Sequence, residues 1–163
     1  MVNKTFPEVE VFGADMFRDY RGDIWTTYKK RDSLVKLDFI HDKYSSSKRN
    51  VIRGIHGDYK TWKMVSCLHG ELYFVVVDNR PESETYLQWD WMMLDDKERR
   101  QVLLPPGFGN GFCVMSKSAV FSYKLAYDGE YSDVNQQFTL KWNDPRANID
   151  WPTDNPILQA RDK

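Results

Sequence analysis

The chain has 163 residues, of which 41% are hydrophobic, and its 23 Lys and Arg residues against 24 Asp and Glu residues give a formal net charge of -1. This length and hydrophobic content suit one globular domain over residues 1–163 with a core of its own. The balanced charge argues against nucleic acid or an anionic membrane as a partner. No stretch approaches the length of a membrane span, and the first ten residues lack the apolar region of a signal peptide.

Short apolar or alternating runs follow one another along the chain and predict an all-β fold. We expect strands at residues 8–12, 24–28, 35–41, 63–68, 71–78, 87–94, 101–104, 111–115 and 120–127, separated by turn clusters such as RDYRGD, DNRPES, PPGFGNG and YDGEYSD. The run ELYFVVVD predicts a strand that is buried on both faces, and LDDKERR predicts a short helical turn. The spacing of the strands is typical of a jelly-roll sandwich or barrel. Residues 141–163, rich in Pro, Asn and Asp, predict an ordered coil that wraps the barrel.

Residues 51–65, VIRGIHGDYKTWKMV, place charged side chains in a segment that otherwise suits a buried sheet. Histidine has a reference pKa of ~6.5, so His56 can act as a general base near neutral pH. Arg53 and Lys63 are cations that can hold phosphate or stabilise an oxyanion. Tyr123, in FSYKLAY, is a phenol on an apolar strand and can act as an acid. A lone histidine or tyrosine is more often structural, and it is their company that favours acid–base chemistry.

The sequence argues against a metal centre and against a nucleophilic site. The three histidines are dispersed, GD follows His56 where a jelly-roll metal site has a second histidine, and Asn110 stands where the proline-glycine turn supplies another. Neither Cys67 nor Cys113 lies in a nucleophile motif. Each lies in an apolar run and is expected to be a buried free thiol, which favours a reducing, cytoplasmic setting. We therefore expect acid–base chemistry without a metal ion or another cofactor.

Five segments, VIRGIH, WKMVSCLHGELYFVVVDNRPES, LPPGFGNGF, FSYK and WNDPRANIDWP, resemble in this order the signatures of the dTDP-4-dehydrorhamnose 3,5-epimerase family. The resemblance runs from FRDYRGDIW to the last residues. It implies a cupin-like jelly roll, a homodimer with exchanged strands and no cofactor. It also implies epimerisation at C3 and C5 of a nucleotide-diphosphate-linked 4-keto-6-deoxy sugar through an enolate.

The resemblance further implies a role for each matching catalytic residue. His56 resembles the base that removes the proton next to the ketone, and Asp162, in QARD, resembles the carboxylate paired with it. Lys63 resembles the lysine that stabilises the enolate oxygen at C4. Tyr123 resembles the acid on the opposite face of the sugar.

The same comparison marks residues expected to bind the substrate. Arg53 resembles the arginine beside the base, Arg21 an arginine placed for the diphosphate, and Phe17 an aromatic residue near the nucleotide base. At three further positions near the sugar and the diphosphate the chain departs from the family pattern, and we count these residues as substrate-binding too: Lys43 in HDKYS, Asp58 in HGD where the family commonly has HFQ, and Asn110.

Three alternatives remain open at this point. The RGIHGD and KLAYDGEY segments look more like a branch that acts on a GDP-linked 4-keto hexose or heptose, with inversion of C3 or C5 alone. A related jelly-roll enzyme, a nucleotide-sugar 3,4-ketoisomerase, would move the ketone. A sugar-binding jelly roll without activity would need no histidine–aspartate pair opposed to a tyrosine.

Overall fold

The computed structural model describes residues 5–28 and 36–163, and in this part of the chain strands dominate. They are β1 (Glu10–Phe12), β2 (Asp15–Asp19), β3 (Gly22–Thr26), β4 (His41–Lys48), β5 (Ile52–Gly57), β6 (Trp62–His69), β7 (Glu71–Asp78), β8 (Trp89–Asp95), β9 (Gln101–Leu104), β10 (Phe108–Val114), β11 (Ser118–Ala126) and β12 (Phe138–Thr139). Two short 3-10 helices, η1 (Val134–Gln136) and η2 (Ala160–Asp162), lie near the end of the chain. The all-β prediction is confirmed.

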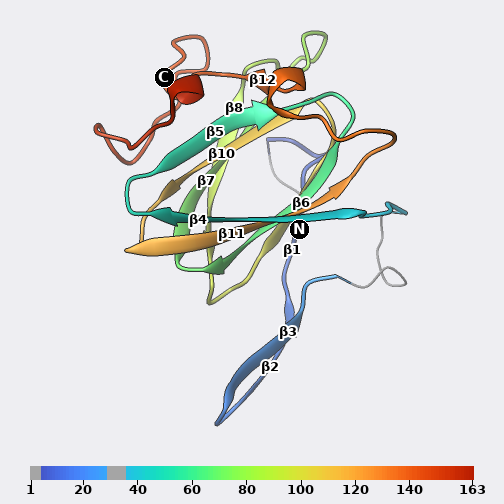
Figure 1. The fold of residues 1–163 in the computed structure, drawn as a ribbon, viewed down its shortest axis with the longest axis vertical. Helices are drawn as coiled ribbons and strands as arrows, with labels where there is room; N and C mark the ends of the chain where they lie inside the picture. Colours follow the sequence, from blue (N-terminus) through green and yellow to red (C-terminus); the bar gives the residue numbers. More distant parts are fainter. Residues whose placement is uncertain (1–4, 29–35) are drawn as a thin grey trace.

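The strands form two five-stranded antiparallel sheets that face one another (Figure 1). The first has the order β1-β9-β6-β11-β4, and the second has the order β12-β5-β10-β7-β8. Apolar side chains of both sheets, among them Val65 of β6, Phe74 of β7, Phe112 of β10 and Phe121 of β11, meet in one core cluster. This arrangement is the jelly-roll sandwich expected from the strand spacing.

Strand β7 shows why ELYFVVVD is apolar throughout. Successive side chains of a strand point to opposite faces. Leu72, Phe74 and Val76 enter the core between the sheets, whereas Val75 and Val77 enter a second apolar cluster. Both faces of this strand are therefore buried, as the sequence predicts.

The C-terminal tail supplies the cover for that second cluster. Trp151 and Leu140 pack there, and the Tyr73 hydroxyl donates a hydrogen bond to the carbonyl of Asp150 (3.1 Å). Ile157 forms an isolated bridge with Val51. The tail thus wraps the second sheet, and this prediction is also confirmed.

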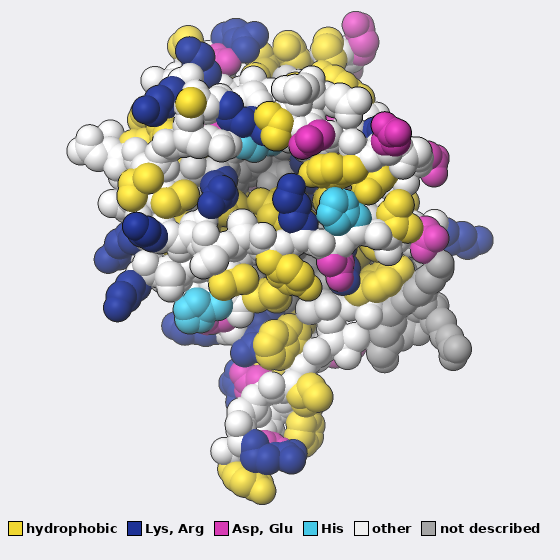
Figure 2. Space-filling view, viewed as in Figure 1, with side chains coloured by type: hydrophobic (Ala, Val, Ile, Leu, Met, Phe, Trp, Pro, Cys, Tyr) yellow, Lys and Arg dark blue, Asp and Glu magenta, His cyan; other side chains and the backbone are white. Residues whose placement is uncertain are grey.

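Strands β2 and β3 pair only with each other and project from the sandwich as an arm (Figure 1). Phe17 and Ile24 on the arm are 62% and 69% exposed, and Figure 2 shows apolar side chains along it. The Arg99 guanidinium stacks over the Trp25 ring of β3, 3.4 Å from the centroid, and binds Asp23 of the same strand at 3.2 Å. These contacts fix the arm to the turn between β8 and β9.

Several expected elements differ from the observed ones. The strand predicted at 35–41 is wrong over residues 36–40, which form no strand, and residue 35 lies outside the described part; the strand in this region is β4, whose polar sequence hid it. No strand is expected from the sequence over residues 15–19, which form β2. LDDKERR forms the end of β8 and a single turn in which the Arg99 N–H donates to the Asp95 carbonyl (3.2 Å), four residues earlier, which is the short helical turn that the sequence predicts. The glycine-rich PPGFGNG segment is mostly strand β10.

Candidate active site

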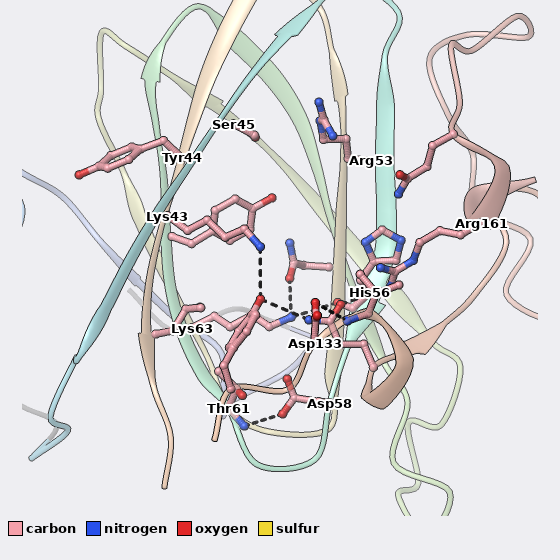
Figure 3. Close-up of a pocket in the computed structure, with 17 residues that line it drawn as sticks. Lys43, Tyr44, Ser45, Arg53, His56, Asp58, Thr61, Lys63, Asp133 and Arg161 are labelled. Carbon is pink, nitrogen blue, oxygen red and sulfur yellow. Dashed lines mark hydrogen bonds between the residues drawn. The ribbon is translucent and has the colours of Figure 1, made fainter. Parts of the chain in front are cut away.

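A pocket of about 180 Å³ opens between the two sheets (Figure 3). It brings together most of the residues that the sequence singled out, namely Lys43, Arg53, His56, Asp58, Lys63, Asn110 and Tyr123. Strands of both sheets supply its walls, and the segment around η1 and the C-terminal tail supply further lining residues, including Tyr131, Asp133, Gln137 and Arg161. The pocket is therefore assembled from segments that lie far apart in the sequence.

The glycine of RGIH determines how closely the strands that carry His56 and Asn110 approach. These two residues lie opposite each other in the β5–β10 pair. Gly54 has a φ of +115°, and a Cβ atom there would lie 2.5 Å from the Cα of Gly111. Only glycine accepts both the positive φ and this contact. The motif thus sets the position from which the histidine enters the pocket.

His56 pairs with a carboxylate from the last turn of the chain. Its Nε2 lies 2.6 Å from Oδ1 of Asp162, whose side chain is fully buried. The Trp142 N–H donates to the Asp162 carbonyl (3.2 Å), which ties η2 to the tail. Because a carboxylate only accepts, Nε2 carries the proton of the neutral ring and Nδ1 carries the lone pair. The histidine is thereby held in the tautomer that a base needs.

Lys63 lies beside this pair with its ammonium largely out of solvent. Its Nζ donates to the His56 carbonyl and to Oδ1 of Asn110, both at 3.1 Å. Burial lowers the pKa of Lys63 to about 8, with Asp58 acting in the opposite direction. An ammonium has three N–H bonds, so one remains for a developing negative charge in the pocket.

Tyr123 enters the pocket from β11, in the sheet opposite to the one that carries His56. Its ring packs edge-on against Phe121, with centroids 4.7 Å apart. Burial raises the pKa of Tyr123 to about 12, so the phenol keeps its proton at neutral pH. A basic imidazole and a protonated phenol thus approach one space from two sides.

The remaining charged groups make the pocket electropositive. Four cations line it, Lys43, Arg53, Lys63 and Arg161, against the carboxylates of Asp58 and Asp133. Figure 2 shows basic side chains around a hollow in this face of the molecule. Arg53 is oriented by a hydrogen bond from its Nε to Oγ of Ser47 (2.9 Å). Such a set suits a phosphate-bearing ligand.

Two residues that the sequence singled out lie elsewhere. Phe17 and Arg21 are on the β2–β3 arm, outside this pocket, and Arg21 pairs with Asp19 of the same arm (2.6 Å). Conversely, the sequence analysis missed Arg161 and Tyr131. Arg161 directly precedes the predicted Asp162, and that adjacency was the available signal. The position of Tyr131 depends on how the segment after β11 folds back, which no local pattern reveals.

The sequence disfavours a nucleophilic cysteine, a metal centre and a membrane span, and the structure bears on each of these. Cys67 and Cys113 are free and buried, and burial raises the pKa of the thiols to about 12 and about 11 respectively. Over residues 5–28 and 36–163, no group of three or more His, Cys, Asp or Glu side chains is arranged to hold a metal ion. In the same ranges no helix is long and apolar enough to cross a membrane.

Comparison with known proteins gives consistent matches. A sequence profile of the dTDP-4-dehydrorhamnose 3,5-epimerase family matches residues 3–163. The dTDP-4-dehydrorhamnose 3,5-epimerase of Escherichia coli K12 is 37% identical, over 100% of this chain and 91% of that protein. A dTDP-4-dehydrorhamnose 3-epimerase of Streptomyces niveus is 41% identical over 73% of this chain and 58% of that protein. The crystal structure of the 3,5-epimerase from Legionella pneumophila with dTDP-4-keto-L-rhamnose superposes with a TM-score of 0.89 at 30% identity, covering 99% of this chain and 88% of that one.

Proposed function

The chain belongs to the dTDP-4-dehydrorhamnose 3,5-epimerase family, and we propose that it inverts C3 and C5 of a nucleotide-diphosphate-linked 4-keto-6-deoxy sugar without a cofactor. One observation carries the proposal. The His56–Asp162 pair and the protonated Tyr123 enter the same pocket from opposite sheets, with the Lys63 ammonium beside the histidine.

The reaction begins with the removal of a proton next to the ketone. Nδ1 of His56 takes the proton, and the electron pair of the broken C–H bond moves into an enolate whose charge falls on the oxygen at C4. Lys63 donates a hydrogen bond to that oxygen. The buried Asp162 carboxylate stabilises the imidazolium that forms. Each group acts on charge that develops only as the reaction proceeds.

Inversion requires that the carbon regain a proton from the other face. Tyr123 donates its phenol proton to that face, which forms the new C–H bond and leaves a phenolate. The histidine then loses its proton to solvent and the phenolate gains one, so both groups return to their starting states. Repeating the cycle at the second carbon gives the doubly inverted product.

The cationic lining of the pocket is proposed to hold the diphosphate. Arg53 and Lys43 supply charge from two different sheets, and Asn110 orients Lys63. The substrate class is that of the relatives, one of which is described in complex with dTDP-4-keto-L-rhamnose.

We further propose that the protein is a homodimer in which the β2–β3 arm reaches the pocket of the partner. Phe17 and Arg21 lie outside the pocket of their own chain, and the arm exposes large apolar side chains. Burying them on a second copy would explain both facts. In the partner's pocket Phe17 would contact the nucleotide base and Arg21 the diphosphate.

The two buried free thiols support a reducing setting, and we propose the cytoplasm.

A 3-epimerase that inverts only one carbon is the second candidate function. The 41% identity to the Streptomyces niveus 3-epimerase favours it.

Incubation with dTDP- and GDP-linked 4-keto-6-deoxy sugars in deuterated water tests the assignment. NMR would show deuterium at C3 and C5 together with inverted product for a 3,5-epimerase, and at one carbon for a monoepimerase. A ketone that migrates to C3 would identify a ketoisomerase. Absence of exchange with every sugar would leave a binding protein. The His56→Asn variant provides the baseline.

A further inference from the structure

Asp58 is a buried carboxylate in the turn between β5 and β6, at the edge of the pocket (Figure 3). Its Oδ1 accepts hydrogen bonds from the backbone N–H groups of Lys60 (2.9 Å) and Thr61 (2.7 Å). Its Oδ2 is buried and has no hydrogen-bond partner among the described residues. Oδ1 therefore stabilises the turn. The turn does not account for the burial of Oδ2 or for the negative charge of the side chain.

Lys63 is a buried cation whose hydrogen-bond partners carry no negative charge. It is only 8% exposed, and the two atoms that accept its hydrogen bonds, the His56 carbonyl and Oδ1 of Asn110, carry no net charge. A buried ammonium without a counter-charge tends to lose its proton. Lys63 needs its proton in order to stabilise an enolate, so the pocket has to supply a negative charge near it.

The elements packed around Lys63 offer few anions. The titratable groups that line the pocket include His56 and Arg53 of β5, Tyr123 of β11, Lys43 of β4, and Tyr131 and Asp133 of the segment before η1, whereas β9 contains no titratable residue. Helix η2 presents Arg161, which acts against the ammonium, and Asp162, which carries a negative charge but directs Oδ1 at Nε2 of the His56 ring, whereas Lys63 contacts the His56 carbonyl. Of the two carboxylates that line the pocket, Asp58 is buried, at 3% exposed, whereas Asp133 is exposed to solvent, and the charge of Asp58 favours the charged form of Lys63.

We propose that Asp58 is a positioning residue that acts through Lys63, as the counter-charge that keeps the buried ammonium protonated while His56 is neutral. The inference rests on the proposed epimerase function. It assigns Asp58 a role in the chemistry of the pocket rather than a contact with the sugar. The carboxylate is also one of the positions at which this chain departs from the family pattern, so the role concerns this chain.

The proposal predicts how Lys63 titrates. Because an opposite charge nearby shifts a pKa by ~1–3 units, removing the Asp58 charge should lower the pKa of Lys63 by about one unit. This change corresponds to an acid dissociation constant about tenfold larger. The pH range in which Lys63 is charged would therefore end at a lower pH.

The direct test is Asp58→Asn, which keeps an Oδ1 acceptor for the turn and removes the charge. Trace acetylation of the free protein with acetic anhydride across a pH series, followed by mass spectrometry of the Lys63 peptide, measures the pKa of Lys63 without any turnover. Asp95→Asn is the matched control. Asp95 caps the β8–β9 turn through the same pattern, accepting from Lys97 and Glu98 at 2.8 Å each, and does not line the pocket.

A second variant tests the opposite sign. Arg161→Gln removes a positive charge that lowers the pKa of Lys63, so its Lys63 should titrate at higher pH than in the parent protein. We expect Asp58→Asn and Arg161→Gln to shift the labelling curve in opposite directions, with Asp95→Asn on the parent curve. An unchanged Lys63 curve in Asp58→Asn would overturn the proposal, as would an increase in KM with unchanged Lys63 titration, which would make Asp58 a substrate contact. Because labelling needs no substrate, absence of epimerisation would overturn only the proposed function.

Discussion

Nε2 of His56 lies 2.6 Å from Oδ1 of Asp162, although 106 positions separate the two residues in the chain. The contact depends on the docking of the tail on the second sheet, where Ile157 pairs with the strand region next to β5. The carboxylate that pairs with His56 thus comes from helix η2 in the C-terminal tail. Anything that loosens the tail should weaken the reaction before it weakens the fold.

Asp162→Asn should lower the deuterium exchange rate by ~100- to 10,000-fold, in the range of general-base contributions. The amide cannot stabilise an imidazolium, and it can donate to Nε2 and so favour the wrong tautomer. Exchange of the α-proton in deuterated water, read by NMR, measures the effect. His56→Asn should abolish exchange altogether. If Asp162→Asn exchanged at the parent rate, the pair would have no part in the chemistry.

The pH dependence of kcat/KM should fall on the alkaline side as Lys63 loses its proton. Burial lowers the pKa of Lys63 to about 8, and the protonated form is the active one, so activity is present below this pH and is lost as the pH rises through it. Deprotonation of Lys63 does not unfold the protein in this range. The pKa of Lys63 is about 8 in the folded protein and 10.5 in the unfolded chain, so between these two pH values the free energy of unfolding rises with pH. A pH profile together with thermal melts at each pH separates the two effects. A profile that stays flat to pH 10 would contradict the role of Lys63.

Gly57→Ala should destabilise the protein by about 1–3 kcal/mol, as overpacking of a filled site does. A Cβ at Gly57 would run into the Phe138 ring and lie 2.6 Å from the carbonyl oxygen of Phe108. Gly13→Ala is the matched control, because a Cβ there meets nothing within 4 Å. Thermal or denaturant unfolding of the two variants gives the difference. Equal midpoints would mean that β12 can move away from β5 without loss.

The sequence was most informative where side chains alternate into a core and least informative where the backbone alone decides. Strand β7 could be predicted as buried on both faces because its residues alternate between two apolar clusters. Strand β4 reads HDKYSSSK and could not, because it is held by its ladder with β11 while its side chains face the pocket or solvent.

The same limit applies to the pocket. His56, Lys63 and Tyr123 could be proposed from strand-like segments with a charged or phenolic residue. Arg161 and Tyr131 could not, because a coil and a loop bring them to the pocket. The resemblance, where it begins in FRDYRGDIW, matched Phe17 to an aromatic residue near the nucleotide base and Arg21 to an arginine placed for the diphosphate. In the proposed dimer a second chain would bring them to a site, which no pattern along one chain can show.

Mixing two inactive variants should restore activity if the arms serve the partner's pocket. A chain with Phe17→Ala and Arg21→Ala keeps its catalytic residues, and a chain with His56→Asn keeps its arm. In a mixed dimer the intact arm serves the intact pocket, so refolding the two together should give up to about a quarter of parental activity from one working pocket in half of the dimers. Light scattering checks that the parent protein is a dimer. A mixture no more active than its components would place the arm elsewhere.

Tyr123→Phe should separate exchange from inversion. The ring and its edge-on contact with Phe121 remain, but the phenol proton on the face opposite His56 is gone. His56 can still remove a proton and return deuterium to the same face, so deuterium should enter the substrate while little inverted product forms. NMR of the recovered sugar reports both events in one sample. Loss of exchange together with inversion would make Tyr123 a binding or folding residue. Undiminished inversion would mean that another group in the pocket is the acid. Tyr131, which also carries a phenol, would then be the first candidate.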